Sequence, residues 1–333
     1  MDRERLIGIA LVVISACGYG SGPLFAKPAY AAGVDWLTLL AWRFLFAAVL
    51  SWGWLLIWPA QRRALRNLPR RRIAVLILLG VFFVGNSGTY FAGLEYVSAS
   101  LSALIVYMYP ALVAVMTIRF GRRLEGRRAW GALALASLGV VLAVGGIDPT
   151  NPPQPIGLVL MISSPIIYAI WIVLAGRLAG ERGARAREEN AGLALPHDSD
   201  STEEVRDAAP TAAIMLTATA VAWWIWALAA GNPVLPQQIP VAAWLPLIGV
   251  GIVSTAIALQ TFYAGARRIG AAQASLVSTV EPVYTIILAA LLFGERLTPL
   301  QLVGGAFVIV GVLVAQSGQL LPRAAHTSPQ SAA

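Results

Sequence analysis

Apolar residues gather along this chain in ten runs of bilayer length, separated by polar connections. The runs are Leu6–Ala26, Trp36–Trp58, Ile73–Ala92, Ala99–Ile118, Ala129–Gly145, Ile156–Gly176, Ala209–Ala229, Val241–Ala264, Ala271–Phe293 and Leu300–Ala315. At ~1.5 Å of rise per residue, about 20 residues of helix cross the ~30 Å core of a bilayer. The pattern predicts an all-α membrane protein with ten transmembrane helices.

The composition agrees with this prediction. Of the 333 residues, 58% are hydrophobic and only 12% are charged, and the mean hydropathy is +0.73. These values are typical of a membrane protein. A net charge of +8 would suggest a nucleic-acid partner in a soluble protein. Here the arginines follow the membrane topology, so we expect no nucleic-acid partner.

The positive charges lie on one side of the predicted membrane. The N-terminus, the even-numbered connections and the tail together hold 21 of the 24 lysine and arginine residues. Only Lys27, Arg43 and Arg296 lie elsewhere. Because positively charged loops stay on the cytoplasmic side, both termini are predicted to be cytoplasmic, in an inner-membrane protein.

The two halves of the sequence are similar. At an offset of 172 residues, Thr89–Gly93 aligns with Thr261–Gly265 and Pro110 aligns with Pro282. Each half holds five predicted spans, an odd number, so the second half must enter the membrane from the opposite side. The sequence therefore predicts two inverted five-helix repeats, residues 1–147 and residues 148–317.

Two segments fall outside this repeat. The connection at about 178–208 is long, charged and poor in apolar residues, which favours a flexible cytoplasmic insert that the fold does not need. The tail, residues 318–333, is rich in Ser, Pro and Gln and is predicted to be disordered. A regulatory role of the insert is the less favoured alternative.

The spans offer little for enzyme chemistry. The histidines, His197 and His326, lie in the insert and the tail, and Cys17 is the single cysteine. No motif for a metal, a catalytic triad or a phosphate-binding loop is present in the sequence. We therefore expect no cofactor, no metal and no enzymatic activity.

Two charges remain inside the predicted spans. At ~1.5 Å of rise per residue, Arg43 lies about 12 Å from the outer end of its span, and Glu281 lies about 16 Å from the inner end of its own span. These depths nearly meet in the bilayer, which allows an ion pair. Charged residues at such depth are functional candidates, for binding or coupling, but a purely structural pair is an equal alternative.

Polar and aromatic residues of other spans extend this candidate site. Tyr109 and Glu281 occupy equivalent repeat positions, and each precedes a proline, Pro110 or Pro282, that would serve as a hinge. An aromatic cavity with a few polar groups suits a small organic molecule. The candidate substrate-binding or coupling residues are Glu281, Arg43, Tyr109, Tyr284, Tyr263, Tyr90, Asn86 and Gln260.

At this point the chain resembles the EamA-type transporters of the drug/metabolite transporter superfamily. The resemblance rests on Glu281–Tyr284 followed by Gly294–Thr298, on Arg43-Phe44, and on the basic residues Lys27 and Arg177 after the first helix of each half. The sequence departs from that pattern at Tyr109, at the Gly18-Tyr19-Gly20 run and in the long sixth connection.

The resemblance implies a secondary transporter that works by alternating access. Such proteins are often exporters of amino acids or related small metabolites, so the expected partners are the lipid bilayer and a small molecule, with protons as a candidate coupling ion. The chain would act as a monomer or homodimer. The alternative is a non-transporting membrane receptor or scaffold that retains the fold. A channel is disfavoured because the sequence has no repeated filter motif.

Overall fold

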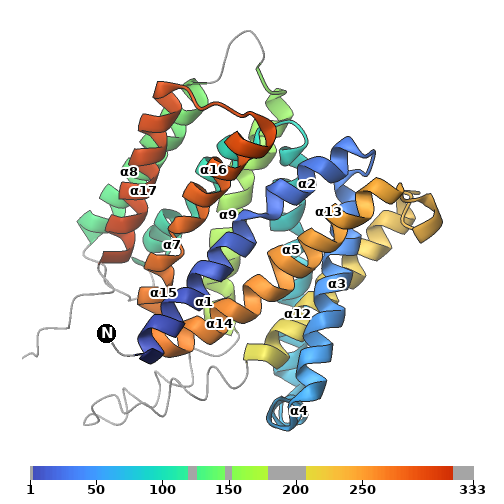
Figure 1. Ribbon diagram of the computed structural model, residues 1–333. Helices are drawn as coiled ribbons and strands as arrows, with labels where there is room; N and C mark the ends of the chain where they lie inside the picture. Colours follow the sequence, from blue (N-terminus) through green and yellow to red (C-terminus); the bar gives the residue numbers. More distant parts are fainter. Residues whose placement is uncertain (1–2, 119–125, 147–151, 179–207, 318–333) are drawn as a thin grey trace, which may run out of the picture.

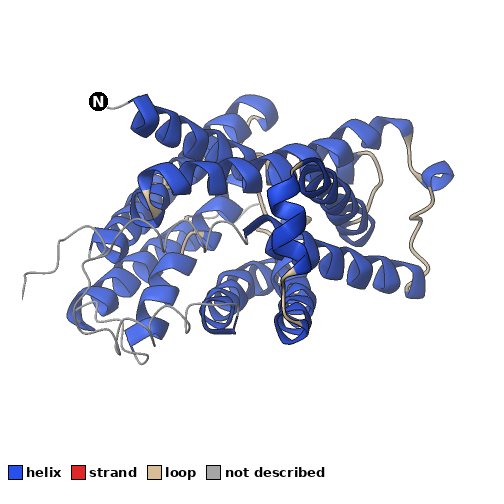
Figure 2. Cartoon of the chain, turned by 90° about the horizontal axis from the view of Figure 1, so that it is seen from below, coloured by secondary structure: helices blue, strands red, loops and turns tan. Residues whose placement is uncertain are grey.

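The described part of the chain folds entirely into helices joined by short connections. The computed structural model describes residues 3–118, 126–146, 152–178 and 208–317 (Figure 1). Every regular element within these ranges is a helix (Figure 2). In such apolar segments, helices satisfy the backbone N–H and C=O groups without water. The predicted tail lies outside the described residues, and so does the predicted insert, apart from Leu178 at the end of α9 and Ala208 at the start of α12.

The first part of the chain covers five of the predicted runs. Its helices are α1 (Arg3–Gly20), α2 (Gly22–Ala31), α3 (Trp36–Ile57), α4 (Pro59–Arg66), α5 (Arg70–Leu94), α6 (Ala99–Val106), α7 (Tyr109–Ile118) and α8 (Gly126–Gly145). The short helix α4 carries arginines on a connection that the hydrophobic pattern left without an element.

The second part of the chain covers the other five runs. Its elements are α9 (Pro155–Leu178), α12 (Ala208–Ala229), the 3₁₀ turn η1 (Pro236–Gln238), α13 (Val241–Gly251), the π-helical segment η2 (Ile252–Ile257), α14 (Ala258–Ile269), α15 (Ala271–Val277), α16 (Val280–Phe293) and α17 (Pro299–Ser317). Within the described ranges, six helices are long and apolar enough to cross a membrane, and four shorter apolar helices accompany them. The structure is therefore that of a multi-helix membrane protein.

Some of the predicted spans are broken near their middle. The regular helix is interrupted at Ser21 between α1 and α2, at residues 107–108 between α6 and α7, and at residues 278–279 between α15 and α16. Each interruption is followed within a few residues by a proline. Proline has no N–H for the carbonyl four residues earlier, so a regular helix cannot continue unchanged through it.

The most extensive packing joins helices that are far apart in the sequence. In Figure 1, α8 lies beside α17, and α1 lies along α14; α3 likewise packs on α12 and α5 on α9. Each of these pairs joins one helix from residues 3–145 with one from residues 155–317. The core is thus built between the two parts of the chain.

Small residues permit the closest of these contacts. A Cβ atom built on Gly139 of α8 would lie 2.5 Å from the Gly304 carbonyl oxygen of α17, and a Cβ on Gly304 would lie 2.5 Å from the Gly139 carbonyl oxygen. No real Cβ fits so close to a backbone oxygen. Close helix packing at Gly304, expected for small residues of membrane helices, is therefore present and reciprocal.

Candidate functional site

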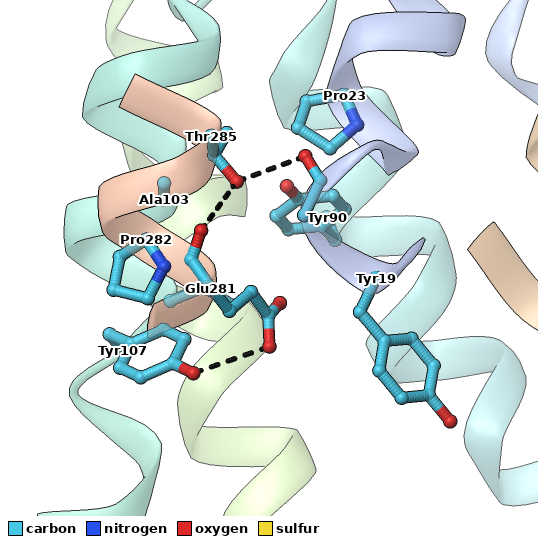
Figure 3. A pocket seen from close by; sticks show the side chains of 10 residues that line it. Tyr19, Pro23, Tyr90, Ala103, Tyr107, Glu281, Pro282 and Thr285 are labelled. Carbon is cyan, nitrogen blue, oxygen red and sulfur yellow. Dashed lines mark hydrogen bonds between the residues drawn. The ribbon is translucent and has the colours of Figure 1, made fainter. Parts of the chain in front are cut away.

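A small pocket lies where the broken helices meet. It is narrow, and α1, α2, α5, α6 and α16 contribute to its wall (Figure 3). The lining residues are Tyr19, Gly20, Pro23, Tyr90, Ala103, Val106, Tyr107, Glu281, Pro282 and Thr285. We call this cavity the Glu281 pocket, because Glu281 is its one acidic or basic lining residue.

The start of α16 holds Glu281 in place. The Thr285 hydroxyl donates to the Gly20 carbonyl oxygen of α1, at 2.9 Å, and lies 3.0 Å from the Glu281 carbonyl oxygen one turn earlier. Figure 3 shows both contacts beside the carboxyl group, which extends into the pocket. The backbone of Glu281 is therefore fixed to α1, while its side chain remains available to the cavity.

Tyr107 links the two helix breaks. It lies in the α6–α7 break and its hydroxyl donates to the Ser278 carbonyl oxygen in the α15–α16 break, at 2.5 Å. The same hydroxyl lies 3.2 Å from Glu281 Oε2. Because Pro282 cannot supply the usual helical N–H to the Ser278 carbonyl oxygen, this oxygen accepts the Tyr107 hydroxyl besides the Glu281 N–H, which lies at 3.0 Å. Only 3% of Tyr107 is exposed.

Arg43 lies in the same interior but binds elsewhere. Its Nε donates to the Thr255 hydroxyl of η2 at 2.9 Å, and its guanidinium carbon lies 4.5 Å from the centre of the Phe91 ring. Within the described ranges no ion pair joins Arg43 to Glu281, so the pair considered from their depths is not formed. Arg43 faces Tyr19 and Tyr90, which line the Glu281 pocket.

The remaining predicted site residues divide between the pocket and its surroundings. Tyr90 lines the pocket directly, and so does the predicted hinge Pro282. Tyr109 stacks edge-on against Tyr168 of α9, with ring centroids 4.8 Å apart. Pro110 follows Tyr109 at the start of α7, next to the break that contains Tyr107.

Four of the predicted site residues do not line this pocket: Asn86, Tyr284, Tyr263 and Gln260. Asn86 accepts a hydrogen bond from Ser164 at 3.0 Å and so ties α5 to α9. Tyr284 lies 3.1 Å from the Ser21 hydroxyl, and Tyr263 packs on Phe262. The Nε2 atom of Gln260 is buried without a hydrogen-bond partner among the described residues.

Thr285 is a site residue that the sequence argument missed. Its distance of four residues from Glu281 places both on one face of α16, which was a usable signal. Tyr19 and Tyr107 were distinguishable only as aromatic residues of the predicted spans. Nothing in the sequence indicates that Tyr107 contacts the other half of the chain.

A second polar cluster closes the end of the bundle near α2. Glu295, in the α16–α17 connection, accepts the backbone N–H groups of Ala99 and Ser100 at 2.9 Å each and so caps α6. Glu95 accepts the N–H of Trp36, and Lys27 interacts electrostatically with both carboxylates. The pKa of Glu95 is raised, mainly by partial burial.

No group of three or more His, Cys, Asp or Glu residues in the described part of the chain is arranged to hold a metal ion. The Glu281 pocket itself offers one carboxyl group, several phenols and backbone carbonyls beside helix breaks. Such a set can bind polar groups and exchange protons.

The comparisons with known proteins agree with this architecture. The model of the EamA-like transporter family matches residues 6–145 and 204–316 of the chain. The chain belongs to the EamA-like transporter family. It is a membrane transporter, and its family membership indicates a transporter rather than an enzyme.

Similar proteins carry related names. The uncharacterized transporter YcbK of Bacillus subtilis is 27% identical, over 92% of this chain and 93% of its own. An uncharacterized transporter of Archaeoglobus fulgidus is 26% identical, over 92% and 96%. The uncharacterized inner membrane transporter YedA of Escherichia coli K12 is 24% identical, over 86% and 84%. Together with the apolar helices, these relatives support a multi-pass inner membrane protein.

A solved structure shares the fold. It superposes with a TM-score of 0.56 and is 18% identical, covering 94% of this chain and 97% of the matched chain. At this identity the likeness concerns the arrangement of helices alone.

Proposed function

We propose that this chain is a secondary transporter that exports small metabolites, such as amino acids or related compounds, by alternating access. The observation that carries the proposal is the Glu281 pocket. It places a carboxyl group among aromatic side chains at the meeting point of helix breaks. Broken helices that surround a polar site are the usual construction of transporter binding sites.

The proposal includes ten spans arranged as two inverted repeats. The described helices cover all ten apolar runs, four of them with shorter helices. The helix pairs support a twofold relation: α1 of the first half packs on α14 of the second, and α9 of the second packs on α5 of the first. In the proposed repeat, α9 is the counterpart of α1, and α5 is the counterpart of α14. The α9–α5 contact is then equivalent to the α1–α14 contact.

Equivalent breaks support the same relation. Residues 107–108 precede Pro110, and residues 278–279 precede Pro282, at positions that the 172-residue offset nearly superimposes. Pro110 and Pro282 are proposed as hinges at which the two halves rearrange. The domain limits remain those of the repeat, residues 1–147 and 148–317, with both termini in the cytoplasm.

Arg43 is the proposed anchor for an anionic substrate group. Its guanidinium uses Nε for Thr255 and rests on an aromatic ring, and no carboxylate of the described residues pairs with it. A guanidinium has five N–H donors in a planar arrangement that matches carboxylates. Glu281, with no basic partner, is proposed to bind a proton or a cationic substrate group.

The test begins in cells, because the substrate is to be identified. Metabolite pools are compared between cells that lack the protein and cells that overproduce it. We expect at least one small polar metabolite to accumulate inside when the protein is absent and to be depleted when it is abundant.

Purified protein in liposomes loaded with that metabolite should then release it faster than protein-free liposomes. A Glu281→Gln variant of normal yield should release it slowly. Unchanged pools in cells together with no release from liposomes would contradict the proposal and favour the scaffold alternative.

A further inference from the structure

If Glu281 is charged, the single proton of the Tyr107 hydroxyl cannot serve both of its contacts. A phenol carries one proton, and the Ser278 carbonyl oxygen can only accept. The shorter contact, at 2.5 Å, therefore uses the Tyr107 proton for Ser278. The second contact, 3.2 Å from Glu281 Oε2, is a full hydrogen bond only when Glu281 is protonated and donates to the phenol oxygen.

The surroundings of Glu281 fit a neutral carboxyl group. The titratable side chains that face it are all tyrosines, from four helices and one helix break, and in the described part of the chain no basic residue forms an ion pair with it. These residues are Tyr19, Tyr90, Tyr107, Tyr109 and Tyr168. A carboxylate left without a positive partner in this interior is costly.

We propose that Tyr107 is a positioning residue that joins the two helix breaks only while Glu281 holds a proton. In that state Glu281 donates to Tyr107, and Tyr107 donates to the Ser278 carbonyl oxygen. When the carboxyl proton leaves to water or to a basic group of the substrate, the carboxylate becomes the stronger acceptor for the Tyr107 proton. Tyr107 then turns its only proton to Glu281 and releases Ser278.

The consequence is a link between one proton and the contact of the two halves. Ser278 belongs to the break before α16 and Tyr107 to the break after α6, so release of this bond loosens the two parts of the chain from each other. The remaining partner of the Ser278 carbonyl oxygen is the Glu281 N–H, at 3.0 Å, within the same turn. This inference rests on the proposed function, for which the bond would be one step of the cycle.

Amide hydrogen exchange of the full chain in lipid nanodiscs tests the proposal without a substrate. Exchange is followed by mass spectrometry in peptides that cover Ser278–Glu281 and Tyr107–Met108, between about pH 5 and 9, after correction for the intrinsic pH dependence of exchange. In the native protein we expect one step, with protection lower at high pH by roughly fivefold, the factor for one neutral hydrogen bond.

Two variants should abolish this pH-dependent step: protection should stay high at every pH in one and low at every pH in the other. Glu281→Gln keeps a donor toward Tyr107 at every pH, so protection should remain at the high level. Tyr107→Phe cannot bond Ser278, so protection should remain at the low level, also in the double variant with Glu281→Gln. Tyr96→Phe, which removes the hydroxyl of an exposed tyrosine that does not line the pocket, is the matched control and should keep the native step.

The outcomes are decisive for this inference alone. A native protein without a step, a step retained in Tyr107→Phe, or a step retained in Glu281→Gln would overturn it. Absence of metabolite transport in liposomes would contradict the proposed function but would leave the exchange result standing, so the two failures are distinguishable.

Discussion

At the residue scale, the two buried charges of this protein are separate. Glu281 contacts Tyr107 at 3.2 Å, whereas Arg43 contacts Thr255 at 2.9 Å and stacks on Phe91. Each charge therefore has its own surroundings, and loss of one does not leave the other without a counter-ion. The two residues therefore do not form a structural ion pair with each other in this structure.

The separation predicts that variants of the two residues do not compensate for each other. Arg43→Gln and Glu281→Gln should each insert with normal yield and should each lose most of the transport. The double variant should be no better than the weaker single one, because partners in a structural pair rescue each other and independent groups do not. Initial efflux rates from liposomes check this. Recovery of activity in the double variant would instead indicate a paired state elsewhere in the cycle.

The sequence allowed prediction of the charged residues of the site but not of their partners. An embedded Glu or Arg is recognisable because it is rare in an apolar run. The contact of Tyr107 with Ser278 depends on how two segments, 171 residues apart, meet in space. Hydrophobic periodicity and helix propensity contain no information on which distant segments contact each other. Tyr284 illustrates the same limit, because its ring sits on α16 beside the pocket residues and yet bonds toward Ser21.

At the element scale, the stability of the bundle rests on a few close helix contacts. The pair α8–α17 is the clearest, since Gly139 and Gly304 place backbone against backbone. Gly131 on α8 has nothing within 4 Å of a Cβ placed on it and is exposed. The same helix therefore offers a test position and its control.

Gly139→Ala should destabilise the protein and Gly131→Ala should not. In the first variant the new methyl group meets the Gly304 carbonyl and the helices must separate. In the second, helix propensity favours Ala by about 0.5–1 kcal/mol. Thermal unfolding in detergent should show a lower midpoint for Gly139→Ala and an equal or higher midpoint for Gly131→Ala. Equal midpoints for both variants would mean that the contact is looser than the structure indicates.

A second element-scale prediction concerns the cap that Glu295 provides for α6. Both carboxylate oxygens accept backbone N–H groups, of Ala99 and Ser100, and the Gln amide can replace only one of them. Glu295→Gln should lower the free energy of unfolding by about 1 kcal/mol, the usual size for loss of a helix cap. Arg296→Gln, an exposed neighbour, is the control and should leave the unfolding midpoint unchanged.

The positions of the elements followed well from hydrophobic runs, and their interruptions did not. All ten runs fall on helices, because a long apolar segment has no other way to satisfy its backbone. A proline in such a run weakens the helix, but Pro165 lies inside α9 without ending it, whereas Pro110 and Pro282 follow breaks. Proline alone therefore does not end a helix, and the break before Pro282 is also the place where Tyr107 contacts Ser278.

At the scale of the whole molecule, the uneven distribution of arginine predicts the orientation. A reporter that is active in the cytoplasm should be active when fused after Arg187, and one that needs the outer side should be active when fused at Pro152. The reason is that basic connections stay inside. Activity of both fusions on the same side would contradict ten spans, because these positions flank one predicted span.

At the same scale, the inverted repeat stays a prediction from the sequence. Two halves with an odd number of spans need such an arrangement, and reciprocal pairs such as α1–α14 and α5–α9 are what it would produce. The detailed fit of the pairs could not be read from the sequence, because a similar amount of apolar surface would pack equally well in other orders.

The pairing of helices across the chain also bears on how the protein is made. During synthesis, α1, α3, α5 and α8 enter the bilayer before their main neighbours α14, α12, α9 and α17 exist. The early helices must wait in lipid, as a loose set of inserted spans, until the ribosome has delivered the later ones. Assembly is therefore completed only near the end of translation, and a nascent chain that stops early has no finished core to protect it from membrane proteases.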